Sequence, residues 1–340
     1  MELSTVWFLL IAVLWTGYLV LEGFDFGVGM LLPVLGRKDA DRRVMINTIG
    51  PVWDGNEVWL LTAGGATFAA FPEWYATLFS GFYLALLLIL VALIVRVVAF
   101  EWRSKFNDPR WRAWADRALI VGSWIPAVLW GVAFGNIVRG VNLGEGFQYT
   151  GNFFDLLNPF ALLGGATTAL IFLTHGAIYL SLKTDGEIRA KAGALSVRLS
   201  MVTLVVAGAF AVWLQVAFSE AAWTWGATLL AAVALVAVVL LTRMGREGWA
   251  FTASAVAILA AVVLIFGSLF PDVLPALDGV HSLTVDNASS SAYTLTVMTW
   301  VAVLLTPVVL AYQAWTYWVF RKRLTVEHIP AHVGLPLAKV

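Results

Sequence analysis

The feature that most constrains this chain is a series of apolar segments, each close to twenty residues long and separated by shorter polar stretches. A helix of about 20 residues crosses the hydrocarbon core of a bilayer, which is about 30 Å thick. Of the 340 residues, 61% are hydrophobic and only 12% are charged, far from the average of soluble domains. We therefore expect an all-α, multi-pass membrane protein whose residues 1–340 form a single membrane domain.

Nine segments have the length and hydropathy of a membrane span, and we expect each of them to be a transmembrane helix. They cover residues 6–32, 50–70, 75–100, 118–138, 158–181, 199–218, 222–242, 249–270 and 292–319. The first segment lacks the short pattern of a cleaved signal peptide, so we interpret it as a retained span.

The Lys and Arg residues predict the orientation of the chain. Cytoplasmic loops of membrane proteins carry an excess of these residues. With nine spans, all but one of the 21 fall in odd-numbered loops, at the inner end of the third span or in the C-terminal tail, and Arg139 is the exception. We expect the N-terminus outside and the C-terminus in the cytoplasm.

Carboxylates at membrane depth are the main candidates for function. A charged side chain at the bilayer centre costs roughly 2.5–3.5 kcal/mol on insertion scales, so it usually faces a bundle interior and often marks a charge path. Glu22 and Asp25 lie three positions apart in the first span, and Asp54 and Glu57 repeat this spacing at the start of the second. Residues at this spacing share one helix face. Glu101 follows at the inner end of the third span.

These five acids predict a path for protons that starts at the cytoplasm, because all of them fall in the inner half of the bilayer in the expected orientation. Other interpretations remain open for single residues. Asp54 could cap the N-terminus of its helix. Glu22 and Glu57 could reach the interface or pair with basic loop residues, and Glu101 could form an ion pair with Arg96 or Arg103.

Redox and metal chemistry within this chain is restricted by its few ligands. There is no cysteine and there are four histidines, which excludes disulfides and thiolate ligands. His175 is the one histidine in a predicted span, and we interpret it as a hydrogen-bonded core residue, with proton relay or haem ligation as alternatives. We expect no metal site and no catalytic residue in this chain. The balanced charge gives no indication of nucleic-acid binding.

Seven tracts in order resemble subunit II of the cytochrome bd-type quinol oxidases. They are residues 23–29, 50–65, 80–83, 131–136, 149–154, 157–160 and 297–303. The run Trp-Asp-Gly-Asn-Glu-Val-Trp at 53–59 is the most specific, and the resemblance extends over nearly the whole chain. It implies nine helices, arranged as two four-helix bundles plus one peripheral helix.

The resemblance also implies a function. In that family, subunit I carries two b-type haems and one d-type haem, oxidises quinol and reduces oxygen. Subunit II is haem-free, pairs with subunit I in the bacterial cytoplasmic (inner) membrane and contributes a proton path from the cytoplasm. Asp54 and Asp25 match acids of that path, and Glu101 occupies a position where relatives have an acid. The resemblance leaves open a structural quinone in this chain and small accessory subunits.

One departure from the family and two rival functions follow. The link between the sixth and seventh spans, residues 219–222, is very short, while some relatives have a long insert there. Membrane acids and glycine breaks also suit a proton-coupled secondary transporter, and a pure scaffold for a partner is a third, simpler alternative.

Small residues suit close packing of helices, and we expect such packing at Gly64, Gly65, Gly164 and Gly165.

Overall fold

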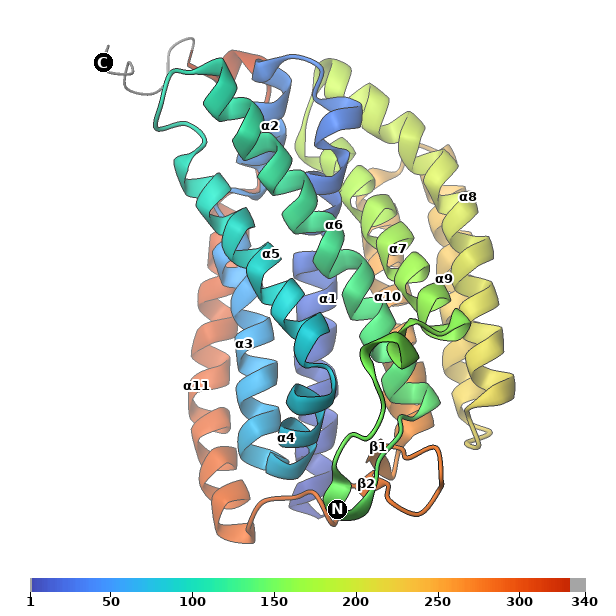
Figure 1. Ribbon diagram of the computed structural model, residues 1–340. Coiled ribbons are helices and arrows are strands. Elements are labelled where there is room, and N and C mark those ends of the chain that lie inside the picture. The colour runs from blue at the N-terminus through green and yellow to red at the C-terminus, as the bar shows by residue number, and fades with distance from the viewer. Residues whose placement is uncertain (1, 331–340) are drawn as a thin grey trace.

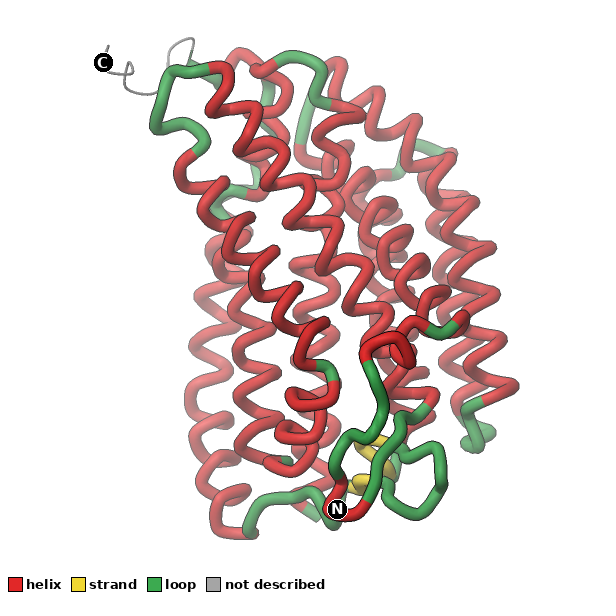
Figure 2. The backbone as a smooth tube through the Cα atoms, in the orientation of Figure 1, coloured by secondary structure: helices red, strands yellow, loops and turns green. Residues whose placement is uncertain are grey.

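The computed structural model describes residues 2–330, and helices make up most of this part of the chain (Figures 1 and 2). The α-helices are α1 (Leu3–Leu35), α2 (Asp39–Ile49), α3 (Trp53–Ala70), α4 (Pro72–Gly81), α5 (Tyr83–Trp102), α6 (Pro109–Arg139), α7 (Pro159–Lys183), α8 (Gly186–Ala217), α9 (Thr224–Arg243), α10 (Glu247–Leu269) and α11 (Ala292–Val319). Short strands β1 (Asp272–Leu274) and β2 (Leu283–Thr284) form an antiparallel pair, and three short 3-10 helices lie at Glu145–Phe147, Phe153–Leu157 and Val326–His328.

Within residues 2–330, eight helices are long and apolar enough to cross a membrane, which confirms the expected helical membrane fold. The second predicted span, α3, is not among them. Its first turns carry Asp54, Asn56 and Glu57, and these polar residues lower its mean hydropathy. Since α3 still packs along α1 and α11 (Figure 1), the count of nine spans remains an expectation.

The helix boundaries differ from the predicted spans in two places. The predicted third span divides into α4 and α5 at Phe82, where the backbone leaves the helical region (φ −99°, ψ 16°). The predicted loop after the first span contains α2, which the hydropathy search missed because the helix is too short and polar to span a membrane. The paired spacing of its buried residues, Val44 with Thr48 and Met45 with Ile49, is the helical signal that marks it.

Helix α1 lies at the centre of the packing. It contacts α3, α6, α7 and α10, and its residues 22–32 are all buried. Glycines permit the close approach of α1 to α7, because a Cβ atom on Gly27 would lie 2.0 Å from the carbonyl oxygen of Phe172. Helix α11 packs mainly against α1 and α3, and Leu295 is its one buried residue. This position agrees with a peripheral helix.

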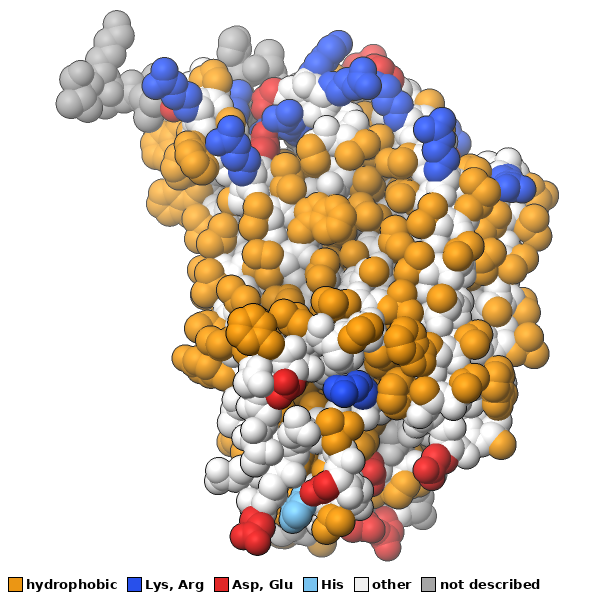
Figure 3. Space-filling model, turned by 45° about the vertical axis from the view of Figure 1, so that its right-hand side comes forward, with side chains coloured by type: hydrophobic (Ala, Val, Ile, Leu, Met, Phe, Trp, Pro, Cys, Tyr) orange, Lys and Arg blue, Asp and Glu red, His pale blue; other side chains and the backbone are white. Residues whose placement is uncertain are grey.

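Charge is distributed unevenly between the two ends of the molecule. Figure 3 shows Lys and Arg side chains gathered at the end where α2 lies in Figure 1, and apolar side chains over the middle. At that end Asp116 accepts hydrogen bonds from Arg103 (2.6 Å) and Arg42 (2.9 Å), and Arg103 also reaches Asp39 (2.8 Å). Lys339, counted with the basic tail, lies outside the described residues. The asymmetry agrees with the expected orientation but does not test it.

The contact between α6 and α7 yields a prediction about stability. A Cβ atom on Gly131 would lie 2.2 Å from the carbonyl oxygen of Gly164, so Gly131→Ala should force the two helices apart at a cost of about 1–3 kcal/mol. We expect a lower apparent Tm, measured by circular dichroism on the purified protein. Gly226→Ala is the control, since a Cβ atom there meets nothing within 4 Å. Equal Tm values for the two variants would contradict the packing described here.

Candidate functional site

A buried ion pair joins α1 to α5. Arg96 donates from Nη1 to Oε1 of Glu22, and both side chains are fully shielded from solvent. The guanidinium carbon of Arg96 also lies 4.7 Å from the ring centre of Phe26 and 5.1 Å from that of Phe100. The sequence predicts that Arg96 lies at the inner end of its span, and the structure adds that its charge is held in the protein interior.

The ion pair leaves polar atoms without a partner. Oε2 of Glu22 and both Nε and Nη2 of Arg96 have no hydrogen bond within residues 2–330. Buried polar atoms that stay unpaired are costly, and each one calls for a physical reason. The site therefore offers both a free acceptor and free donors inside the helix bundle.

Asp25 lies one turn from Glu22 on α1 and is also fully buried. Its Oδ2 accepts a hydrogen bond of 2.7 Å from Nδ2 of Asn56, while its Oδ1 has no partner in the described chain. The sequence places no cation near Asp25, but the fold brings Arg96 close enough to act on it electrostatically. Two acids of the predicted path thus meet around one cation.

Asn56 connects Asp25 to the peripheral helix α11. Its Oδ1 accepts from the Tyr317 hydroxyl at 2.6 Å and, more weakly, from Nε2 of Gln313 at 3.5 Å. Oε1 of Gln313 in turn accepts from the indole N–H of Trp59 at 2.9 Å. Residues 313 and 317 are four apart, so they share one face of α11, and this face makes a polar contact near the C-terminal end of the helix.

The remaining predicted acids are more exposed. Asp54 lies in the first turn of α3, exposed and without a hydrogen bond or ion pair in the described chain. The helix cap is Val52, so the capping alternative for Asp54 is wrong. Glu57 is half-buried one turn further along and lies within electrostatic range of Arg96 and Asp54. The structure therefore groups Glu22, Asp25 and Glu57 around Arg96, with Asp54 at the exposed end of α3.

Glu101 does not join this group. It is exposed near the end of α5, and it forms no ion pair within residues 2–330. Its two expected partners are engaged elsewhere, since Arg96 pairs with Glu22 and Arg103 with Asp116 and Asp39. The ion-pair alternative for Glu101 is therefore wrong.

Sequence reasoning overlooked Arg96, Asn56, Gln313 and Tyr317 as members of the site. Arg96 could have been found, because a cation within an apolar span is itself a sign of a buried partner. The two residues on α11 lie more than 250 positions from Asn56. No local pattern links residues at that separation.

His175 is a hydrogen-bonded core residue in this structure. Its Nδ1 lies 2.6 Å from the Ser254 hydroxyl and its Nε2 lies 3.0 Å from the carbonyl oxygen of Val20. The ring also stacks on Phe251 at a centroid distance of 4.5 Å. Both nitrogens are engaged, which leaves none free for an iron atom. Within residues 2–330, no three His, Cys, Asp or Glu side chains gather in a manner suited to a metal.

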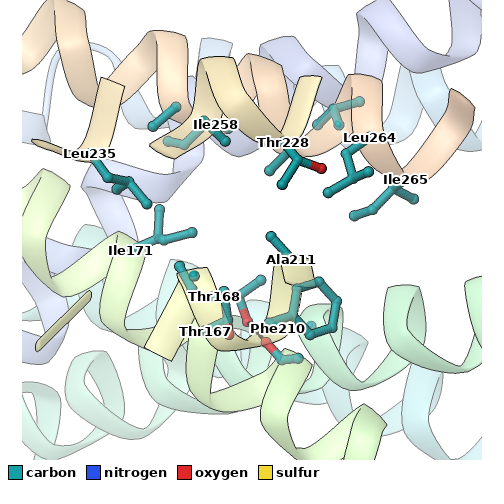
Figure 4. Close-up of a pocket in the computed structure, with 18 of the residues that line it drawn as sticks. Thr167, Thr168, Ile171, Phe210, Ala211, Thr228, Leu235, Ile258, Leu264 and Ile265 are labelled. Carbon is teal, nitrogen blue, oxygen red and sulfur yellow. Dashed lines mark hydrogen bonds between the residues drawn. The ribbon is translucent and has the colours of Figure 1, made fainter. Parts of the chain in front are cut away.

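Two cavities lie among the helices. The larger, of about 130 Å³, is lined by apolar side chains and by Thr167, Thr168 and Thr228 (Figure 4). Each of these hydroxyl groups already donates a hydrogen bond, to Leu163, Ala127 or Gln215. The smaller cavity, of about 70 Å³, is rich in aromatic side chains and includes Trp74, whose buried N–H has no partner in the described chain.

The four glycines expected to pack closely fall into two classes. Gly164 and Gly165 are buried against Gly131 and Val128 of α6, so their close contacts are internal to this chain. Gly64 and Gly65 on α3 face open space, because a Cβ atom on either would meet nothing within 4 Å. Gly64 lines the smaller cavity, while Gly65 is exposed and leaves room for another polypeptide.

Comparisons with known proteins assign the family. The family model described as "Cytochrome bd terminal oxidase subunit II" matches residues 3–320. The chain is 42% identical to "Cytochrome bd-I ubiquinol oxidase subunit 2" of Escherichia coli (strain K12), covering 96% of each chain. It is 40% identical to "Cytochrome bd ubiquinol oxidase subunit 2" of Bacillus subtilis (strain 168), covering 95% of this chain and 97% of the relative.

A solved structure shares the fold. A chain from "The structure of bd oxidase from Geobacillus thermodenitrificans" superposes with a TM-score of 0.76 at 18% identity, covering 95% of this chain and all of that one. The family model spans nearly all of the sequence, and the two relatives are matched over almost their full lengths. The chain therefore belongs to the cytochrome bd terminal oxidase subunit II family, whose members are parts of an oxidoreductase complex.

Proposed function

We propose that this chain is the haem-free subunit of a terminal quinol oxidase and supplies protons from the cytoplasm to oxygen reduction in a haem-bearing partner. The observation that carries the proposal is the group of buried acids around Arg96. Glu22 and Asp25 are fully buried, and each has one carboxylate oxygen without a hydrogen bond in the described chain. An acid with a free oxygen away from water can take and release a proton during turnover.

Charge balance supports this role. Glu22, Asp25 and Glu57 are three acids that face a single cation, Arg96. If all three were ionised, the group would carry a net charge of −2, with Glu22, Asp25 and Arg96 fully buried and Glu57 half-buried. Uncompensated charge is strongly unfavourable in a low-dielectric interior. The group is therefore suited to hold a proton, and Glu22 serves mainly as the fixed counter-ion of Arg96.

The order of the path follows from exposure. Asp54 is exposed with no partner, so it is suited to collect a proton at the inner surface. Glu57 lies one turn further along α3 and is half-buried, and Asp25 is the fully buried acceptor with its free Oδ1. Glu101, exposed near the inner end of α5, would raise the local proton supply rather than form part of the buried path. A path that begins at the cytoplasm in this way requires the N-terminus outside and the C-terminus in the cytoplasm.

The partner proposed here is subunit I, with two haems b, one haem d and access to the quinol pool. An apolar surface on α11 and α3 suits a neighbouring helical protein or lipid. Leu295 is the one buried residue of α11, and the exposed Gly65 leaves room on α3 for close approach of another backbone. The complex would reside in the bacterial cytoplasmic membrane. Small accessory subunits would be identified by purification of the complex.

A structural quinone would find an unpaired hydrogen-bond donor in the smaller cavity, which at about 70 Å³ must widen to admit the ring. A quinone head group offers carbonyl oxygens as acceptors, and Trp74 supplies a buried N–H without a partner in the described chain. Aromatic walls that include Trp15, Trp130 and Phe134 suit a flat ring. The larger cavity has no such unpaired donor among its described residues and is better suited to an acyl chain.

Two rival functions give different results on purification. A proton-coupled transporter would be isolated without haem and would bind a transported solute. A pure scaffold would be isolated with the haem-bearing subunit, but its buried acids could be neutralised without loss of turnover. Isolation with a coloured partner, together with sensitivity to the acid substitutions below, would support the oxidase subunit over both.

Replacement of the path acids is the direct test. We expect Asp54→Asn and Asp25→Asn each to lower quinol-driven oxygen consumption by about tenfold or more, because a path residue that cannot carry a proton blocks the supply. Charge movement across the membrane should fall with turnover. Asp286→Asn, at an exposed site in the loop before α11, is the control. Haem absorbance should be unchanged in all three complexes.

Two outcomes would contradict this prediction. Full turnover and charge movement in both path variants would contradict the proton role. Loss of the haem spectrum would indicate that the acids serve assembly instead.

Trp74→Phe tests the quinone site. The variant keeps the aromatic wall and removes the N–H, so quinone recovered per haem from the purified complex should fall roughly threefold to tenfold. Trp124→Phe, at a partly exposed position on α6, is the matched control. Equal quinone content in the two variants would argue against a quinone hydrogen-bonded to Trp74.

A further inference from the structure

The hydrogen bonds around Asn56 have a fixed direction that can be read from their ends. A Trp indole N–H can only donate. Because Trp59 lies 2.9 Å from Oε1 of Gln313, the amide of Gln313 must turn its NH₂ group away from Trp59. That group points toward Oδ1 of Asn56, at 3.5 Å. The Tyr317 hydroxyl donates to the same oxygen at the shorter distance of 2.6 Å.

The opposite side of Asn56 gives an independent check. Its Nδ2 lies 3.4 Å from the carbonyl oxygen of Leu21, and a carbonyl can only accept. A flipped Asn56 amide would set two acceptors against each other at Leu21 and two donors against each other at Gln313. Both ends of the group therefore require the same orientation, in which the NH₂ of Asn56 faces α1.

This orientation determines which oxygen of Asp25 can hold a proton. Oδ2 of Asp25 receives the hydrogen of Asn56 at 2.7 Å, so it acts as an acceptor. Oδ1 has no hydrogen bond in the described chain. A proton on Asp25 would therefore reside on Oδ1, and the carboxyl group cannot rotate freely without losing its bond to Asn56.

We propose that Trp59, Gln313, Tyr317 and Asn56 act as positioning residues that lock one oxygen of Asp25 as an acceptor and leave the other as its proton-carrying atom. The inference rests on the proposed proton role of Asp25. It assigns a purpose to α11, which has little buried surface of its own. Through Tyr317 and Gln313, this peripheral helix controls an acid that belongs to the central helix α1.

Other titratable groups also lie near Asp25 and set the background for any pH effect. They are Glu22 on α1, Glu57 on α3, Arg96 on α5, Tyr179 on α7 and Tyr317 on α11. Of these, Tyr317 can lose its hydroxyl without a change in net charge or in ring packing. Tyr317→Phe is therefore the cleanest perturbation, and Asn56→Leu removes the direct donor while it keeps the number and branching of the heavy atoms.

The test uses the whole purified complex and compares three positions. We expect Asn56→Leu to lower quinol-driven oxygen consumption about tenfold, because a hydrogen bond to a carboxylate is lost. Tyr317→Phe should cause a smaller loss. In both variants the pH dependence of turnover should shift toward higher pH, since the ionised carboxylate loses support. The infrared C=O band that disappears in Asp25→Asn should also move.

Tyr312→Phe on the same helix is the matched control, because Tyr312 is 63% exposed and its hydroxyl makes no hydrogen bond in the described chain. Its turnover, pH profile and infrared band should equal those of the unaltered complex.

The outcomes separate this inference from the proposed function. If Asp25→Asn keeps full turnover, the proton role itself is wrong. If Asp25→Asn is inactive but Tyr317→Phe and Asn56→Leu keep the normal pH profile and infrared band, the positioning role is wrong and the proton role stands. A loss of turnover that only follows a loss of haem, with an unchanged pH profile, would also overturn the positioning role. Should Asn56→Leu fail to assemble, Tyr317→Phe decides alone.

Discussion

The structure depends on one constraint, that a cation buried among apolar helices must be neutralised. Arg96 is completely shielded from solvent, and isolating such a charge would cost many kcal/mol. Glu22 provides the counter-charge from α1, and the rings of Phe26 and Phe100 lie against the guanidinium group. The pair fixes the register of α5 against α1, because a shift of either helix would leave both charges unpaired.

The same constraint explains why chemistry can occur beside the pair. One cation can neutralise one carboxylate, but Asp25 and Glu57 also lie within its electrostatic reach. The surplus acids must hold protons or find other partners, and Asp25 finds only Asn56 for one of its oxygens. Because this group has more carboxyl groups than cations, it is suited to exchange protons with a neighbour. Structural neutralisation and proposed proton transfer thus share one set of residues.

Helix α11 illustrates how a peripheral element can influence this centre. Most of its surface is exposed and apolar, which suits lipid or a partner subunit. Two of its inward polar groups, Gln313 and Tyr317, contact Asn56. A partner that packs on α11 would therefore act on the hydrogen bonds of Asp25 through a path of only two residues. Coupling of this kind requires no large movement, since a change in the hydrogen bonds from Gln313 or Tyr317 acts directly on the amide of Asn56.

The sequence by itself determined the helical membrane class, because long apolar segments have no other stable arrangement in a bilayer. It also identified Asp25, Asp54, Glu22, Glu57 and Glu101 as candidates, since acids at membrane depth are rare and conspicuous. It did not reveal which of them meet. The tertiary structure brought Glu22 and Asp25 to Arg96, left Asp54 and Glu101 exposed, and joined Asn56 to residues on α11. Hydropathy reports only the burial of a segment, whereas the rotation of each helix and its neighbours depend on packing between residues far apart in the chain.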